Sequence, residues 1–206
     1  MGLIVEINDA LNVVIPVKVD ADGNTIVYGY HIPISKEVFD ANYRILSATN
    51  AAIFARGSKF AAQVGPRIAT LRLRDEAAQD AADREDFDTD GNPRADGAAA
   101  LLADIKRLTT VMVPGPNGWE CIPVDAAIGR KNIDAEDWSE AESALVFFTC
   151  TYAMTPRANR RRLVEGLFSV MPGLITSLLP TEFASSLSTS TKAATTETRA
   201  ASSVPS

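Results

Sequence analysis

The chain has 206 residues, of which 46% are hydrophobic and 22% charged, and its formal net charge at pH 7 is −6. These proportions are typical of a globular protein. The acidic balance argues against a general nucleic-acid-binding protein, which needs excess positive charge to neutralise phosphates. The longest apolar stretches, Leu145–Met154 and Leu167–Pro180, are shorter than the roughly 18 residues that a membrane-spanning helix needs. We therefore expect a soluble intracellular protein without cofactors.

The first third of the sequence predicts a β-hairpin. The runs NVVIPVKV and TIVYGYHI are rich in β-branched and aromatic residues, and DADGN joins them. The pair Asp22-Gly23 tolerates the positive φ angles of a hairpin turn. Pro16 within the first run indicates an edge strand or a bulge. Ser35 can cap a helix that follows the hairpin.

Helical spacing of apolar residues dominates the middle of the chain. One helix is expected over Lys36–Arg56, a second from about Pro66, a third carrying Leu101, Ile105, Leu108 and Met112, a fourth from a cap at Asp134 to Ala153, and a fifth over Arg157–Met171. The segment VPGPNGWECIP is a turn-rich connector or a short extended pair. The predicted fold class is therefore mainly α, a bundle of about five helices with an N-terminal β-hairpin and a disordered C-terminal tail.

Three segments follow from these predictions. Residues 1–34 form the hairpin segment packed on the helical domain, residues 35–180 form that domain, and residues 181–206 form a flexible tail. In the stretch from residue 184 to residue 206, 12 of 23 residues are Ser or Thr. Such a composition buries too little apolar surface to offset the loss of chain entropy on folding.

Few residues suggest catalysis. His31 is the single histidine, and we expect a structural or solvent-facing role for it. Cys121 and Cys150 lie in apolar surroundings and are expected to be buried free thiols. No phosphate-binding loop, dinucleotide fingerprint or nucleophile elbow is present in the sequence. We expect no enzyme activity and no catalytic, cofactor-binding or metal-binding residues.

The stretch DFDTDGNPRADG begins like a calcium-binding loop. Asp86, Asp88, Asp90 and Gly91 match the first half of an EF-hand loop, but position 12, normally a glutamate, is Gly97. We expect a flexible acidic loop between two helices, and a calcium-dependent regulator remains the alternative hypothesis.

A cluster of four arginines follows the fourth predicted helix. A solvated helix face is the favoured interpretation, since Arg161 and Glu165 can pair at i, i+4. Contact with an acidic partner or a nucleic acid is the alternative. The members of the cluster are Arg157, Arg160, Arg161 and Arg162.

Several segments, in order, resemble one family. They are NVVIPVKV…VYGYHIPISKEVF, AAIFARG, VGPRIATLRLRD, DIKRLTTVMVPGPNGWECIPVDAAI, EAESALVFFT and TSLLPTEFASSLSTST. Together they resemble the tail assembly chaperones of long-tailed bacteriophages, over roughly Leu11 to Thr191. The acidic loop near Asp90 and the arginine run depart from that pattern.

The resemblance implies a function. Such chaperones bind the tape measure protein and keep it soluble until tail tube subunits displace them. The expected partners are therefore the tape measure protein and tail tube subunits, with homo-oligomer formation left open. The expected location is the host cytoplasm and not the mature virion. The alternative is a structural tail or connector component of the virion.

Candidate partner-binding residues lie near the C-terminus, where apolar residues exceed what a small core needs. For most of them core packing is the alternative. Phe183 and Leu187 stand at the edge of the predicted tail without an obvious core, and we expect them to dock the partner. The full set is Phe168, Met171, Leu174, Leu178, Phe183 and Leu187.

Overall fold

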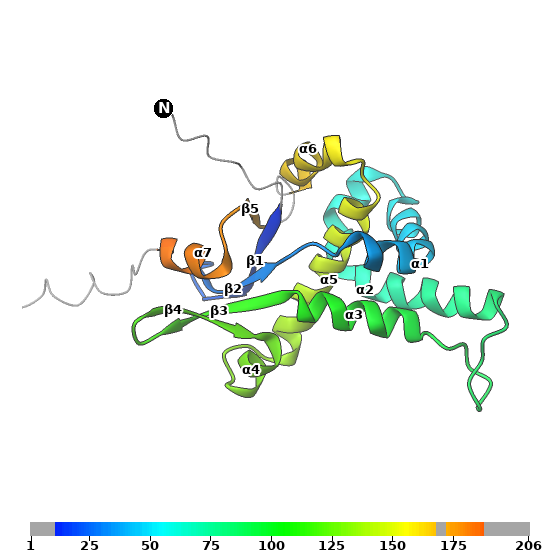
Figure 1. Cartoon of the computed structure of the whole chain (residues 1–206), viewed down its shortest axis with the longest axis horizontal. Helices are drawn as coiled ribbons and strands as arrows, with labels where there is room; N and C mark the ends of the chain where they lie inside the picture. The colour runs from blue at the N-terminus through cyan, green and yellow to red at the C-terminus, as the bar shows by residue number, and fades with distance from the viewer. Residues whose placement is uncertain (1–10, 168–171, 188–206) are drawn as a thin grey trace, which may run out of the picture.

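A five-stranded antiparallel sheet lies at the centre of the protein (Figure 1). The computed structural model describes residues 11–167 and 172–187. The strand order across the sheet is β4-β3-β2-β1-β5. The strands are β1 (Asn12–Val19), β2 (Thr25–His31), β3 (Thr109–Gly115), β4 (Gly118–Pro123) and β5 (Leu174–Thr176).

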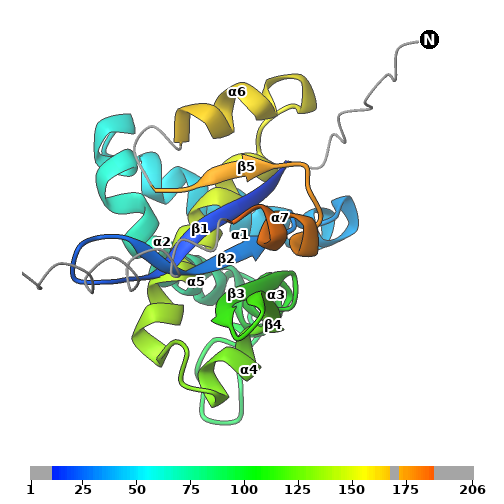
Figure 2. The same ribbon diagram turned by 90° about the vertical axis from the view of Figure 1, so that its left-hand side faces the viewer.

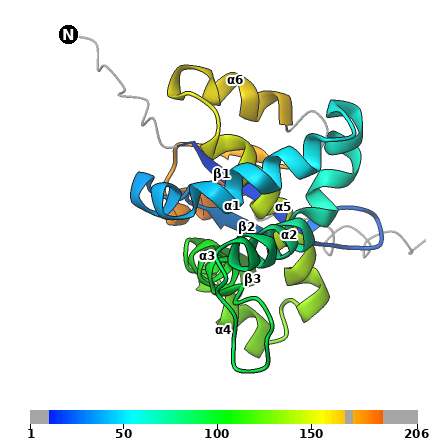
Figure 3. The same ribbon diagram turned by 90° about the vertical axis from the view of Figure 1, so that its right-hand side faces the viewer.

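Helices cover the sheet unequally. The central α5 contacts α1, α2 and α3 as well as β1, and these helices form a layer on one face of the sheet (Figure 3). On the opposite face the short α7 lies against the strands (Figure 2). The helices of the described residues are α1 (Lys36–Phe54), α2 (Ser58–Asp83), α3 (Asp96–Arg107), α4 (Val124–Gly129), α5 (Ala135–Ala153), α6 (Arg157–Leu167) and α7 (Pro180–Ser186).

The predicted five-helix bundle is wrong, because the protein has an α+β fold. The third predicted helix ends at Arg107, and Met112 lies in β3, where it pairs with Tyr28 of β2. The β-branched run Thr109-Thr110-Val111 favours a strand and overrides the helical spacing of the neighbouring leucines. The N-terminal hairpin is therefore the middle of a sheet, with β3 on one side and β5 on the other.

Two predicted elements have the caps that the sequence indicates. Ser35 Oγ accepts a hydrogen bond from the Val38 amide at 3.4 Å at the start of α1. Asp134 Oδ1 accepts from the amides of Glu136 and Asp137 at 2.9 and 2.8 Å at the start of α5. These caps satisfy amides that no helical carbonyl can reach. The start of α2 differs from the prediction, since it begins at Ser58 and Pro66 lies inside it.

The alternation of side chains along β1 divides the apolar residues between two clusters. Val13, Ile15 and Val17 point to the helical layer and belong to the main core with α5. Val14 points to the other face, where it joins Tyr30. Because successive residues of a strand face opposite sides, both faces of this sheet need a cover.

His31 is buried at the junction of β2 and α5. Its Nδ1 lies 3.0 Å from Thr109 Oγ1, which itself donates to the carbonyl of Ile105 at 2.7 Å. The imidazole therefore donates from Nδ1–H, and Nε2 has no partner within the described residues. Burial lowers the pKa of His31 from 6.5 to about 3. This histidine is structural, and its neutral form is the folded one.

Acid should destabilise the protein through His31. Because the folded pKa lies below the unfolded one, unfolded chains take up a proton as the pH falls from 6.5 towards 3. That uptake removes stability by at most roughly 1.4 kcal/mol per pH unit. We expect the urea midpoint of the wild type to fall more steeply between pH 7 and pH 4 than that of His31→Asn, which keeps a donor and does not titrate. Equal slopes for the two proteins would contradict this role.

Candidate functional site

The predicted partner-binding residues mostly belong to one C-terminal segment. Leu174 lies in β5 and Leu178 in the connector to α7, and both are exposed. Phe183 lies in α7 with 7% of its surface exposed, and Leu187 is partly buried. Phe168 and Met171 lie outside the described residues. The segment thus combines a buried anchor with an exposed apolar rim.

The anchor packs on an apolar surface of the sheet, which we call the outer sheet face. The helix α7 lies over this face (Figure 2). Phe183 and Ala184 of α7 pack on it, together with the partly buried Leu187 that follows the helix. Phe183 is therefore not without a core, as the sequence suggested, because the sheet supplies one. The outer sheet face consists of Val14, Tyr28, Tyr30, Met112, Trp119 and Cys121.

Local signals start α7. Pro180 occupies the first turn, where a missing N–H costs nothing. The Leu179 amide donates to Glu182 Oε2 at 2.9 Å, and the Phe183 amide donates to the Leu179 carbonyl at 2.8 Å. Residues 181–186, which the sequence predicts to be part of a flexible tail, therefore belong to a helix. A helix of this length is marginal alone, so its stability depends on the sheet beneath it.

Tyr30 ties the connector to the sheet. Its side chain is 1% exposed, and its hydroxyl donates to the Leu178 carbonyl at 2.7 Å. Burial raises the pKa of Tyr30, and the negative charge of Glu182 raises it further. The hydrogen bond therefore persists up to alkaline pH and holds the chain just before α7 against the outer sheet face.

Replacing Tyr30 by phenylalanine should loosen α7 selectively. The change removes one hydrogen bond, worth about 0.5–1.5 kcal/mol, and keeps the ring in the apolar cluster. We expect faster hydrogen exchange at the amides of α7, with unchanged exchange in α5. In the wild type the same loosening should appear above pH 10, because a Tyr with a raised folded pKa loses its stabilising effect as pH rises. Unchanged exchange in α7 would show that the bond does not hold the helix.

An exposed apolar rim borders this site. Leu174, Leu178 and Leu179 are 41%, 40% and 58% exposed. At the other side Tyr28 and Trp119 form an edge-to-face pair with ring centroids 5.3 Å apart. Rim and outer sheet face together present the apolar, aromatic surface that an amphipathic helix recognises.

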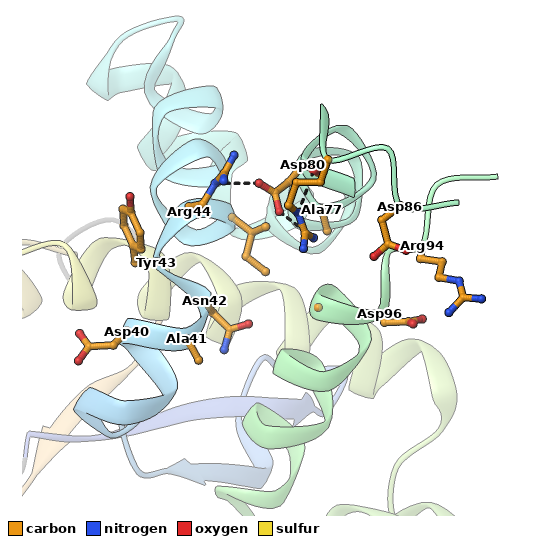
Figure 4. Close-up of a pocket in the computed structure, with 13 residues that line it drawn as sticks. Asp40, Ala41, Asn42, Tyr43, Arg44, Ala77, Asp80, Asp86, Arg94 and Asp96 are labelled. Atoms are coloured by element: carbon orange, nitrogen blue, oxygen red, sulfur yellow. Dashed lines mark hydrogen bonds and ion pairs between the residues drawn. The ribbon is translucent and has the colours of Figure 1, made fainter. Parts of the chain in front are cut away.

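Apart from the outer sheet face, the protein has a hollow between α1, the end of α2 and the start of α3, which we call the second hollow (Figure 4). Its volume is about 500 Å³. Asp80 accepts ion pairs from Arg44 at 2.9 Å and from Arg84 at 3.0 Å. Tyr43 at the rim is 54% exposed. The partly buried carboxylate of Asp80 is therefore paired with two guanidinium groups, and Arg44 joins α1 to α2.

The acidic loop contains a defined turn that the chain uses twice. In DTDGN, Asp88 Oδ1 accepts from the amides of Asp90 and Asn92, both at 2.9 Å. In DADGN of the β1–β2 turn, Asp20 Oδ1 accepts from the amides two and four residues on, at 3.0 and 2.8 Å. The glycines have φ of 81° and 83°. These bonds, led by the one from the asparagine amide, lower the pKa of both aspartates.

The same bonds define the conformation of the loop that resembles a calcium-binding loop. Asp88 Oδ1 accepts backbone amides of its own turn. Across residues 11–167 and 172–187, no group of three or more metal-binding side chains comes together. The loop is an Asx-type turn between α2 and α3.

Shortening this loop should leave the fold intact. The Arg94 amide donates to the Asp86 carbonyl at 3.0 Å, so the two ends of the loop are already adjacent. We expect a variant in which two glycines replace residues 87–93 to keep the thermal midpoint and circular dichroism spectrum of the wild type. A large fall in the midpoint would mean that the loop supports the helices around it.

Two cysteines and two arginines from the sequence analysis also have defined surroundings. Both cysteines are free thiols, and burial raises the pKa of Cys150 to about 12, whereas Cys121 is only partly buried. Arg160 donates to the Thr155 carbonyl at 3.0 Å and stacks over the Tyr152 ring. Arg161 pairs with Glu165 at 3.3 Å, as predicted.

Comparisons with known proteins give no identity for the chain. No family model, no curated protein and no solved structure matches it. Within the part of the chain that the structure describes, no helix has the length and apolar character needed to cross a bilayer. The outer sheet face and the resemblance of the sequence segments are therefore the observations that bear on function.

Proposed function

We propose that this protein is a tail assembly chaperone of a long-tailed bacteriophage and binds the tape measure protein before the tail tube polymerises. The observation that carries the proposal is the outer sheet face, which only seven residues of helix cover in the described chain. The order of segments shared with such chaperones also supports it. The proposal makes the chain a binding protein in the host cytoplasm, absent from the mature virion.

The geometry suggests how a helical client would bind. Phe183 and Ala184 of α7, with Leu187 directly after it, occupy the place that apolar residues of a client helix would take. A client that buries more apolar surface than this short helix would replace it, because each additional buried Å² contributes about 25 cal/mol. The exposed Leu178 and Leu179 then extend the contact beyond the sheet. Binding would keep the client from aggregating by mass action.

Co-expression with the tape measure protein of the same phage tests the proposal. We expect the client to become soluble and to co-purify with the full chain. Trp119→Glu, at the edge of the outer sheet face, should reduce co-purification, whereas Tyr43→Glu, on α1 beside the second hollow, should not. A client that stays insoluble with the wild type would overturn the proposal.

The protein content of the virion distinguishes this proposal from the alternative, a structural tail or connector component. Mass spectrometry of purified particles should find the tape measure protein and not this chain. Stoichiometric amounts of the chain in particles would favour a structural tail or connector component instead.

A further inference from the structure

The apolar residues that α7 presents to the sheet follow a simple pattern. Phe183, Ala184 and Leu187 stand at i, i+1 and i+4, so their side chains lie on one side of the helix. Phe183 and Ala184 are 7% and 4% exposed, and Leu187 is partly buried. The polar residues of the segment are exposed on its remaining sides. They are Thr181, Glu182, Ser185 and Ser186.

The register of the sheet places large side chains opposite this pattern. Val14 pairs with Tyr30, and Met112 pairs with Cys121, so two rows of side chains cross the outer sheet face. Val14, Tyr30 and Met112 are almost completely buried and form one cluster with the two buried residues of α7. With such large groups beneath it, a helix comes close to the sheet only where the residue that faces them is small. Ala184 is that residue in α7.

The helix α7 has little stability of its own. It has seven residues, and its N-cap, Leu179, offers no side-chain acceptor to the first amides. A helix of this length is marginal alone, so α7 depends on its contacts with the sheet and on the Tyr30 hydrogen bond to the Leu178 carbonyl. A longer helix with the same three apolar residues would make the same contacts and bring more internal hydrogen bonds. Such a helix would therefore compete well with α7.

We infer that the outer sheet face selects client helices by the pattern that α7 displays: an aromatic residue, a small residue directly after it and an aliphatic residue four positions after the aromatic one. A polar residue at the aromatic position would be buried without a partner, and a large residue at the small position would lift the helix from the sheet. The inference rests on the proposed function in taking the occupant to be a client helix. The helix α7 is then a built-in competitor for that client.

A labelled peptide of residues 178–187, LLPTEFASSL, is the probe, and fluorescence anisotropy measures its binding to the full-length chain. We expect Phe183→Glu in the chain to raise the affinity for the peptide at least about tenfold, because the chain's own α7 competes less. Tyr30→Phe keeps the apolar contacts and should raise the affinity about twofold to tenfold, since one hydrogen bond of the competitor is lost. Circular dichroism checks that each variant folds. Peptide binding that is undetectable, or equal in the wild type and both variants, would overturn the inference.

Substitutions in the peptide and in the chain test the pattern and the place. In the peptide, Phe183→Ser and Ala184→Leu should each weaken binding to the Phe183→Glu chain at least about tenfold. Thr181→Gln is the matched peptide control and should leave the affinity unchanged, because this position is exposed in α7. In the chain, adding Trp119→Glu should abolish binding, whereas adding Tyr43→Glu should not. Equal affinities for all three peptides would contradict selection by the pattern.

Two further outcomes separate this inference from its alternatives. A wild type that light scattering shows to be a dimer, and that Phe183→Glu makes a monomer, would assign the outer sheet face to α7 of a second copy and overturn the inference. Peptide binding that follows the pattern, with a tape measure protein that stays insoluble, would refute the proposed function alone. A tape measure protein that co-purifies, with peptide affinities that ignore the pattern, would refute this inference alone.

Discussion

Replacing Phe148 by alanine is expected to destabilise the protein by about 3–5 kcal/mol, the usual cost of emptying a fully buried aromatic site. Phe148 has no exposed surface and lies in α5, which contacts both the sheet and the helical layer. Its ring centroid is 5.1 Å from that of Tyr152 and 6.4 Å from that of His31. Tyr152 in α5 and His31 in β2 are fixed by the elements that carry them, so they cannot fill the cavity that the Phe148 ring would leave.

Urea unfolding at pH 7 measures this loss. The control is Tyr43→Ala, which removes an aromatic ring that is 54% exposed and should change the free energy of unfolding by no more than about 0.5 kcal/mol. A loss near 1 kcal/mol for Phe148→Ala would mean that the core relaxes into the space, contrary to the packing described above. A second effect is expected, because the cavity admits water to His31 and should raise its pKa.

Replacing Gly65 by alanine should also be strongly destabilising, although alanine is normally the better helix former. A Cβ at this position of α2 would lie 2.6 Å from Cε2 of Phe147 and 3.1 Å from Cγ2 of Ile53. Phe147 is fully buried and cannot move aside. We expect a loss of about 1–3 kcal/mol from this overpacking.

Two comparisons isolate the cause. Gly166→Ala, in α6, adds a methyl group that meets no atom of the described residues within 4 Å outside the backbone of its own helix, and should leave stability unchanged or raise it. In a double-mutant cycle, Gly65→Ala should cost less in a Phe147→Leu background than alone, because the smaller side chain makes room. Additive losses would contradict the steric explanation. If the losses are not additive, the close approach of α2 to α5 explains why position 65 is a glycine.

Local signals were enough to predict the elements that depend on neighbours in sequence. The hairpin turn at Asp22-Gly23 and the caps at Ser35 and Asp134 are such signals, and the structure has β1, β2, α1 and α5 in those places. The strand β3 pairs with residues of β2 that lie 78 to 84 positions away, and β5 pairs with residues of β1 that lie 160 to 164 positions away. Leu101, Ile105 and Leu108 continue a helical pattern into Met112, but the β-branched residues before Met112 and the pairing with β2 and β4 make that segment a strand.

The candidate site was predicted in part for the same reason. The sequence singled out the segment that packs on and beside the outer sheet face, because Leu174, Leu178, Phe183 and Leu187 are apolar residues beyond the predicted helices. It gave Phe183 the wrong surroundings, since a five-helix bundle has no outer sheet face for it to contact. The groove of about 480 Å³ between β1, α2 and α5 could not be predicted, because its lining residues come together only after folding.

The order of strands has a consequence for synthesis on the ribosome. The central strands β1 and β2 are made first, whereas β3 follows after residue 108 and β5 and α7 come after residue 173. Until β3 is made, the nascent chain therefore carries a hairpin with both edges unpaired, and the outer edge of β1 stays unpaired until β5 is made. The last elements to emerge cover the first ones made, and such long-range closure slows folding. Until then, the nascent chain itself exposes the type of surface that aggregates.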